Sequence, residues 1–390
     1  MKQGWTYKKL GEVCEIVGGG TPSKNNSAYY NGNIPWATVR DMNCEYLSST
    51  EYSISEEGLN NSSSHLINEG EIIIATRVGL GKVCKLSQAT AINQDLKAIV
   101  PKENNIVRDF IYYYFRDKAK YIEDNGVGAT VKGVKIKFIE DLLFPLPPLS
   151  EQQRIVERLD SAFAHIDELK ANAEKQVNEA RALFQKALSK AMEPKDGWEE
   201  KTLKETAKYR RGSFPQPYGN KEWYDGEGSM PFVQVAELQE DSFNLVPITK
   251  RLISKIAQPL SVFVPAGTVL VTLQGSIGKV AITDYDSYVD RTIAIFQDYK
   301  IAVDKTFFAY QLKIRFEIER LKARGTTIKT ITKEEFANFI INCPPLSEQQ
   351  RIVERLDTLS KNVKALEENQ RKVMAECDAL KQALLRKVFE

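Results

Sequence analysis

The chain carries the same fourteen residues twice. The block PPLSEQQRIVERLD occupies positions 147–160 and returns unchanged at 344–357, an offset of 197. The match continues at this offset outside the block, because Gly81-Lys82-Val83 falls on Gly278-Lys279-Val280. Self-similarity over a fixed period means that one folding unit has been repeated. We therefore expect two copies of this unit to fold in the same way.

The two copies have diverged unevenly. Ahead of the repeated block they share mainly glycines, prolines and apolar positions, whereas the block itself is identical. Glycines and apolar spacing fix the course of a backbone, and polar loop residues fix what that backbone contacts. The pattern therefore predicts one scaffold that presents two different surfaces.

The front part of each copy, residues 1–149 and 197–346, has a mixed α/β pattern. Short β-rich runs follow a glycine, as in GEIIIATRV at 70–78, and longer stretches such as DFIYYYFRDKAKYI at 109–122 are typical of helices. Loops rich in glycine, proline and asparagine precede these elements. We predict one globular domain over each of the two ranges.

The back part of each copy is predicted to be one long helix. After a proline stop, Ser150 with Gln153 and Ser347 with Gln350 have the spacing of a capping box. Apolar residues then alternate at spacings of four and three, which is the pattern of a coiled-coil seam. The seam positions are Ile155, Leu159, Ala162, Ile166, Leu169, Ala173, Ala180, Leu183 and Ala187, then Ile352, Leu356, Leu359, Val363, Leu366, Val373, Cys377, Leu380 and Leu384, interrupted by Gln176 and Gln370.

The predicted helices cover residues 150–193 and 347–390. Only a short linker follows the first helix, so the second globular domain must begin at the carboxyl end of that helix. If the two apolar stripes pair within one chain, the helices run antiparallel and separate the two domains, which are then related by an approximate two-fold axis. The alternative is that each helix pairs with another copy of the chain.

Composition excludes several classes of protein. The formal net charge is +2, from 54 basic and 52 acidic residues, so bulk charge gives no argument for nucleic-acid binding. The five cysteines are scattered and never form a Cys-x-x-Cys pair, which argues against a disulfide framework and a zinc site. No apolar run is long enough to cross a membrane. We expect a soluble cytoplasmic protein without a membrane partner.

Catalytic motifs are missing from the sequence. The two histidines, His65 and His165, do not recur between the copies, which excludes a duplicated histidine site. The GLGK and GSIGK segments lack the Walker spacing, since Thr76 and Leu273 stand where the first glycine is required. No Gly-x-Ser-x-Gly motif and no Asp/Asn-Pro-Pro-aromatic motif is present. These absences favour a binding protein over an enzyme, although an enzyme with an unrecognised site remains an alternative.

Two different heads on one symmetric frame suit a protein that reads a symmetric polymer at two points. Duplex DNA is such a polymer, because heads related by a two-fold axis can read sites about one turn apart. When the heads differ, the site need not be a palindrome. Asymmetric recognition is then the expected result of fusing two copies.

The order of globular domain, PLPPLSEQQRIVERLD helix, globular domain and PPLSEQQRIVERLD helix resembles the specificity subunit of type I restriction-modification systems. The segments GGTPSKNNSAYYNGNIPWATVRDM and RRGSFPQPYGNKEWYDGEGSMPFVQVAEL, each followed by a GKV strand, are similar to the opening halves of its target-recognition domains. This resemblance implies a non-catalytic subunit that reads a split sequence in double-stranded DNA, with the paired helices as a spacer. It also implies two methyltransferase subunits docked on the repeated helices and further ATP-dependent restriction subunits. S-adenosylmethionine, ATP and Mg²⁺ are then expected only in those partners, and no cofactor in this chain.

Polar residues in the glycine-rich loops are the candidates for contact with DNA. Arginine and lysine can donate to guanine edges or phosphates, and glutamine and asparagine can pair with adenine. In the first head the candidates are Thr21, Ser23, Lys24, Asn25, Arg40, Arg77, Lys82, Thr130 and Lys132. In the second head they are Arg211, Ser213, Gln216, Tyr218, Gln234, Gln274, Ser276, Lys279, Thr327 and Lys329.

Recurrence sorts these candidates. Lys82 recurs as Lys279, which favours phosphate contact for both, and the same holds for Lys132 and Lys329. Gln274 is the residue of the second copy that corresponds to Arg77 of the first, and this difference suits base recognition. A helix seam requires only its apolar positions to match, yet the polar residues of the repeated block are identical as well. These polar residues are therefore predicted to bind partner subunits. These residues are Glu151, Gln152, Arg158, Glu348, Gln349 and Arg355.

A different class of function fits the helices equally well. A coiled-coil scaffold that holds two protein-binding heads, with no role in nucleic-acid binding, would show the same seams and the same duplication. It gives no reason for Lys82 and Lys279 to persist while their neighbours vary. Duplication too recent for divergence would also leave an identical block.

Overall fold

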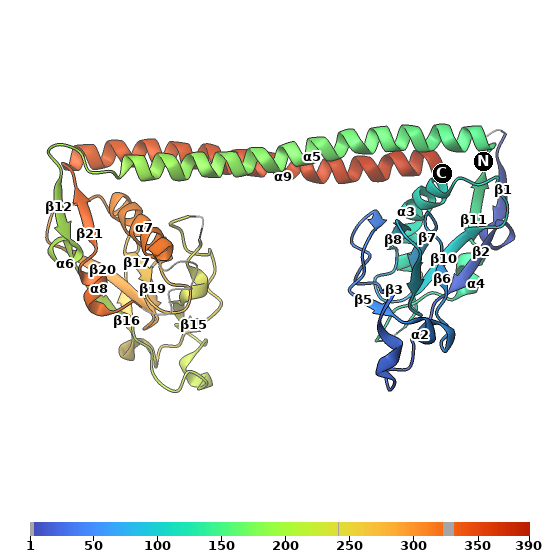
Figure 1. Cartoon of the computed structure of the whole chain (residues 1–390). Coiled ribbons are helices and arrows are strands. Elements are labelled where there is room, and N and C mark those ends of the chain that lie inside the picture. The colour runs from blue at the N-terminus through green and yellow to red at the C-terminus, as the bar shows by residue number, and fades with distance from the viewer. Residues whose placement is uncertain (1–3, 129, 241, 323–330) are drawn as a thin grey trace. The chain divides into compact units, whose positions relative to one another are not determined.

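The chain folds into two compact units. The computed structural model describes residues 4–128, 130–240, 242–322 and 331–390. One unit comprises Met1–Glu174 with Gln370–Glu390, and the other comprises Lys175–Asn369 (Figure 1). Each unit contains one mixed α/β head and two segments of long helix. The predicted duplication of a mixed α/β domain is confirmed.

The first head is built on three sheets. A five-stranded sheet has the order β2-β10-β7-β8-β4, a four-stranded sheet has the order β5-β3-β9-β6, and β1 pairs with β11. The strands are β1 (Thr6–Lys9), β2 (Cys14–Gly18), β3 (Tyr30–Ala37), β4 (Tyr46–Leu47), β5 (Tyr52–Ile54), β6 (Leu66–Ile67), β7 (Ile72–Ala75), β8 (Val83–Leu86), β9 (Thr90–Ile92), β10 (Leu96–Pro101) and β11 (Leu143–Leu146). The helices are α1 (Leu10–Val13), the 3₁₀ turn η1 (Ser27–Tyr29), α2 (Glu56–Asn60), α3 (Arg108–Asp124) and α4 (Ile136–Glu140).

The second head repeats this plan. One four-stranded sheet has the order β13-β20-β17-β18, another has the order β15-β14-β19-β16, and β12 pairs with β21. The strands are β12 (Glu199–Thr202), β13 (Ala207–Arg211), β14 (Met230–Val233), β15 (Leu252–Ile253), β16 (Val262–Val264), β17 (Val269–Thr272), β18 (Val280–Ile282), β19 (Ser287–Val289), β20 (Ile293–Tyr299) and β21 (Ile340–Cys343). The helices are α6 (Leu203–Thr206), η2 (Lys221–Trp223), η3 (Val235–Glu237), η4 (Gln258–Leu260), α7 (Lys305–Lys322) and α8 (Lys333–Ala337).

The central strands are apolar without interruption because both of their faces are covered. In β7, Ile72 and Ile74 pack toward α3, whereas Ile73 and Ala75 belong to the cluster on the opposite face. In β17, Val271 and Leu270 divide between two clusters in the same way. This explains why the run at 70–78 predicted a strand without showing a polar face, and the same holds for its counterpart in the second copy, GTVLVTLQG at 267–275.

The long helices are α5 (Leu149–Ala191) and α9 (Leu346–Phe389). In the first unit, Lys170 lies 2.8 Å from Asp378, and Lys381 pairs with Asp167. In the second unit, the Arg181 guanidinium lies 2.6 Å from the Glu367 carboxylate. Residue numbers rise in one helix as they fall in the other, so the predicted antiparallel pairing within one chain is confirmed in each unit.

Each head holds the end of one long helix and the start of the other. In the first unit, Phe389 of α9 packs on Phe110 of α3, with ring centroids 5.2 Å apart. In the second unit, Leu188 and Met192 at the end of α5 pack with Phe307 of α7. The start of each helix is tied by a tyrosine: the Tyr113 hydroxyl donates to Asp160, and that of Tyr310 donates to Asp357 at 3.1 Å.

Two details of the predicted helices were wrong. Both helices begin before the serine, and the Pro148 carbonyl accepts the Glu151 N–H at 2.9 Å, so the serines lie inside the first turn and form no capping box. The buried face of each long helix also differs from the predicted seam. Residues of α3 help to bury Phe163, and residues of α7 partly bury Phe184, although neither phenylalanine is a predicted seam position. The predicted seam residues Leu169, Leu183 and Leu380 are exposed.

A buried glutamine fastens each long helix to its head. Gln152 has no exposed surface: its Oε1 accepts the Val107 N–H at 2.9 Å, and its Nε2 donates to the carbonyls of Asn105 at 3.0 Å and Pro147 at 2.9 Å. Gln349 does the same with the Asp304 N–H at 2.8 Å and the carbonyls of Ala302 and Pro344 at 3.4 and 2.9 Å. The prediction that Gln152 and Gln349 bind partner subunits is therefore wrong, because their side chains are buried and saturated with hydrogen bonds.

Replacing Gln152 by leucine should destabilise the first unit. The change leaves one N–H and two carbonyls without a partner in a buried position, which costs about 2–4 kcal/mol. We expect a lower midpoint of chemical unfolding for Gln152→Leu, and a similar loss for Gln349→Leu in the second unit. Gln153→Leu is the matched control, because Gln153 is exposed on the same turn. Equal effects of the two substitutions would contradict this role.

Candidate nucleic-acid interface

Two loops of the first head are held together by Lys82. The turn between β7 and β8 lies against the loop that follows β3, and a Cβ on Gly79 would come within 3.0 Å of the Val39 side chain. The Lys82 ammonium donates to the Asn43 side-chain oxygen at 2.8 Å and to the Val39 carbonyl at 3.4 Å. The half-buried lysine therefore bridges the two loops.

Lys279 makes the equivalent bridge in the second head. Its ammonium donates to the Leu238 carbonyl at 3.2 Å and lies 3.7 Å from the Glu240 carboxylate. This bridge gives a reason within the fold for the recurrence of the lysine. Phosphate contact by Lys82 and Lys279 stays a prediction.

A carboxylate closes the loop after β3 and its counterpart after β14. Asp41 accepts the backbone N–H groups of Thr38 at 2.7 Å and Glu51 at 2.8 Å. Glu237, which is buried, accepts those of Gln234 at 2.9 Å and Lys250 at 3.2 Å. Sequence reasoning missed this pair because the letters differ, although Asp41 and Glu237 occupy equivalent positions. The carboxylates fix the loop backbones and leave the other side chains free to differ.

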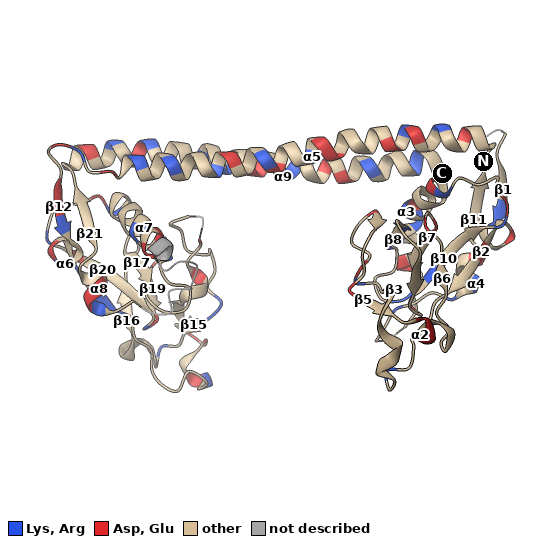
Figure 2. Ribbon diagram, in the orientation of Figure 1, with Lys and Arg blue, Asp and Glu red and all other residues tan. Residues whose placement is uncertain are grey.

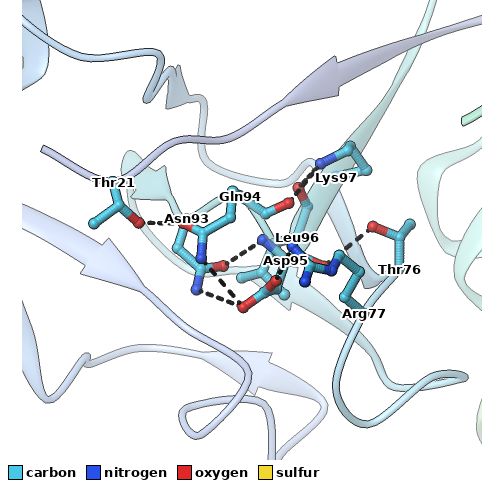
Figure 3. A network of polar contacts seen from close by, with 8 residues as sticks. All are labelled: Thr21, Thr76, Arg77, Asn93, Gln94, Asp95, Leu96 and Lys97. Atoms are coloured by element: carbon cyan, nitrogen blue, oxygen red, sulfur yellow. Dashed lines mark hydrogen bonds and ion pairs between the residues drawn. The ribbon is translucent and has the colours of Figure 1, made fainter. Parts of the chain in front are cut away.

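Thr21 and Arg77 meet through residues that sequence reasoning missed (Figure 3). The Thr21 hydroxyl donates to the Gln94 side-chain oxygen, and Asp95 lies next to Gln94 in the β9–β10 connection. The Arg77 guanidinium lies 3.6 Å from the Asp95 carboxylate, and the Asp95 carbonyl accepts the Thr76 N–H at 2.9 Å. The Asn-Gln-Asp sequence directly after a strand was the available signal.

Lys97 stabilises the backbone of this connection. Its ammonium donates to the carbonyls of Gln94 at 2.8 Å and Leu96 at 3.0 Å (Figure 3). Burial lowers the pKa of the Lys97 ammonium, because the charged form loses solvation. The network thus contains one buried cation, Lys97, and one half-exposed cation, Arg77.

The second head uses different chemistry at the same place. Asp290 accepts the Tyr218 hydroxyl and the Thr292 N–H, the latter at 2.9 Å. The Arg291 guanidinium lies over the Tyr218 ring, 5.3 Å from its centroid. Burial and the hydrogen bond to Asp290 raise the pKa of Tyr218, so the phenol stays protonated at neutral pH. Asp290 and Arg291 were also missed, since no letter in this segment matches the first copy.

The remaining loop candidates of the first head lie mostly on its surface. Val127 and Gly133 adjoin the β7–β8 turn, because Arg77 and Val127 both form a bridge with Gly133. Arg40 lies 3.8 Å from Glu51. The exposed candidates are Ser23, Lys24, Asn25, Arg40, Thr130 and Lys132.

The second head is more mixed. The Ser213 hydroxyl donates to the Leu260 carbonyl at 3.0 Å, and Gln234 precedes η3. Arg211, Gln216, Gln274 and Ser276 are exposed. Thr327 and Lys329 lie outside the described residues, so their assignments remain predictions.

The exposed residues of the repeated block form a charged surface at the start of each long helix. Glu151 pairs with Arg154 at 2.7 Å, and Glu348 pairs with Arg351 at 2.7 Å, so the arginine lowers the pKa of each carboxyl. Arg158 and Arg355 are exposed one turn further along. Basic and acidic residues are interspersed along both helices (Figure 2). These faces can therefore pair with charges of either sign.

A groove of about 380 Å³ lies beside this surface in the first unit, lined by Trp5, Ile155, Leu159 and Leu384 with Glu151 and Arg158. In the second unit, Lys195 lies over the equivalent Trp198 and 3.5 Å from Glu348. The two helix starts thus share their charged residues but differ in what covers the tryptophan.

Within the described ranges, histidine, cysteine, aspartate and glutamate form no group of three that could hold a metal ion. Over the same ranges, every helix is too short or too polar to cross a membrane.

Comparison with known proteins identifies the family. The model of the type I restriction modification DNA specificity domain matches residues 2–179 and again residues 195–375. The type I restriction enzyme MjaIX specificity subunit of Methanocaldococcus jannaschii is 26% identical over 421 residues, covering 98% of this chain and 92% of that subunit.

Two solved structures share the fold at 23% identity. A chain from work on complex assembly and conformational transition of the type I R-M system has a TM-score of 0.80, with 100% of this chain and 98% of that chain covered. The HsdS subunit from Thermoanaerobacter tengcongensis has a TM-score of 0.61, with 100% and 97% covered. With both of its copies matched, this chain belongs to the family of type I restriction-modification specificity subunits.

Proposed function

We propose that this chain reads a bipartite, asymmetric site in double-stranded DNA, with one head on each half of the site. The observation that carries the proposal is the pair of equivalent turns after β7 and β17. Lys82 and Lys279 bridge these turns in the same way, yet Arg77 stands in one and Gln274 in the other. A fixed frame with exchanged polar side chains is what two different half-sites require.

The chemistry of the two turns differs in a way that DNA can distinguish. A guanidinium donates two parallel hydrogen bonds to guanine O6 and N7, whereas a glutamine amide donates to adenine N7 and accepts from adenine N6–H. Arg77 is partly exposed and held by Asp95, and Gln274 is exposed. Exposed lysines such as Lys24 and Lys132 would contact phosphates and position each head.

In this proposal the chain supplies recognition and no catalysis. Two methyltransferase subunits would dock on the surfaces around Glu151 and Arg158, and around Glu348 and Arg355. S-adenosylmethionine would act in those subunits, and ATP and Mg²⁺ in restriction subunits. A scaffold with two protein-binding heads is the competing proposal, and it predicts that no duplex is bound selectively.

DNA binding by the chain together with its methyltransferase partner tests the proposal. We expect tight binding to one split sequence and a linear fall of log K with log salt concentration, because bound phosphates release counterions. Gel shifts against the sequence obtained from methylation profiling, with a scrambled duplex as control, measure both. Binding that is absent, or that ignores sequence, would favour the scaffold.

Arg77→Ala should relax one half-site only. Loss of a bidentate base contact costs about 1–3 kcal/mol at one position and leaves the other half-site unchanged. Gln274→Ala is the matched variant for the second head. Affinity for duplexes with single base changes in each half gives the measurement, and a loss spread over both halves would count against separate heads.

Cys44 is a native reporter for the loop after β3. All five cysteines are described, and Cys44 alone is exposed. Burial raises the pKa of Cys14 and of Cys84 to about 12, so at pH 8 both remain unreactive thiols. We expect Cys44 to react first with a thiol reagent and to be protected by the specific duplex. Cys44→Ser should remove the fast phase, and protection by a scrambled duplex would contradict specific contact.

Charge reversal should remove the partner subunits one at a time. Arg158→Glu should weaken docking at the start of the first long helix on the order of tenfold, and Arg355→Glu should do the same at the second. Each reversal would place a carboxylate against the partner surface that accommodates an arginine. At a concentration between the Kd of the unchanged site and the tenfold higher Kd of the changed site, native mass spectrometry should show mainly one bound methyltransferase for each single variant and mainly none for the double variant. Lys186→Glu, at an exposed position elsewhere on α5, is the control. Two subunits retained by the double variant would exclude this surface.

A further inference from the structure

Val78 occupies a backbone conformation that valine avoids. Its φ is 50°, in the left-handed region, where a β-branched side chain crowds the backbone. The equivalent residue in the second head is Gly275, with φ of 74°, and glycine takes this conformation freely. The first head therefore carries strain at a turn that the second head forms without it.

Packing does not account for the valine. The Val78 side chain is 50% exposed, and it belongs to none of the buried clusters among the described residues. At Gly275 a Cβ would make only ordinary van der Waals contact, 3.8 Å from the Val235 side chain. The second head thus forms the equivalent turn with glycine, and no contact within the described residues explains the strained valine at position 78.

The surroundings of Val78 are those of a recognition surface. Arg77 precedes it, and in the adjoining segment Val127 is 81% exposed and Val131 is 42% exposed. The backbones are fastened together, because Val127 and Gly133 exchange hydrogen bonds of 2.9 and 3.0 Å and Gly133 also bridges to Arg77. Exposed methyl groups therefore lie on the same pair of loops as the guanidinium.

Base edges offer one apolar group in the major groove, the 5-methyl group of thymine. We propose that the Val78 side chain contacts the 5-methyl group of a thymine in the half-site read by the first head, beside the base pair contacted by Arg77. This inference rests on the proposed function and adds a specificity-determining residue to it. The strained turn presents the isopropyl group of Val78 outward. A glycine at this position would leave the thymine 5-methyl group without an apolar contact.

Deoxyuridine tests the contact, because it lacks only the methyl group. In the complex with the methyltransferase partner, each thymine of the specific duplex is replaced in turn. We expect one replacement in the first half-site to weaken binding about fourfold, the effect of losing one buried methyl group. For Val78→Gly the same replacement should have no effect, and replacements in the second half-site should act equally on both proteins.

Stability separates this role from a structural one. Val78→Gly should raise the melting temperature, since strain is relieved, while binding to the thymine duplex weakens. Val78→Thr keeps the branched shape and the strain but replaces a methyl by a hydroxyl, so it should weaken binding without the gain in melting temperature. Specific binding with an unchanged response to deoxyuridine in Val78→Gly would overturn the inference alone. Absence of any sequence-specific binding would overturn the proposed function and this inference together.

Discussion

The hydrogen bonds of one buried glutamine in each unit set the start of each long helix. Gln152 and Gln349 each join a head loop to the proline that precedes the helix, through one acceptor and two donors. A glutamine side chain supplies this combination at this length, and an unpaired group there would be costly. The exposed residues of the repeated block are consequently presented in the same way in both units, which is what two identical partners would need.

The heads follow the opposite rule. Their backbones are fixed by contacts that recur, namely the lysine bridges of Lys82 and Lys279 and the loop-closing carboxylates of Asp41 and Glu237. Side chains that make none of these contacts are free to differ. Specificity can therefore change by substitution on a loop surface without a change of fold. Val78, at the position that is Gly275 in the second head, shows that the loop tolerates even backbone strain.

Electrostatics in these heads is local. The buried or half-buried basic residues Lys82, Lys97 and Lys279 all have partners within the fold, so they hold loops in place. Cations available to a ligand are the exposed ones, such as Arg40 and Lys132. Because the net charge is only +2, a polyanionic ligand would be bound through these few placed groups, whose positions depend on loop geometry.

The sequence by itself determined the duplication, the mixed α/β heads and the long helices, because repeats and apolar periodicity act directly on the backbone. It left open whether the helices pair within one chain, and the ion pairs between them decided this. It also brought forward Thr21, Arg77 and Tyr218 as candidates. Only the tertiary structure decided that Gln152 is buried, that Leu169 is exposed, and that Gln94 and Asp290 complete the two networks. Those outcomes depend on which segments meet across 45 to 73 residues of chain, as in the Gln152 and Thr21 contacts, and side-chain partners at such separations leave no periodic signal.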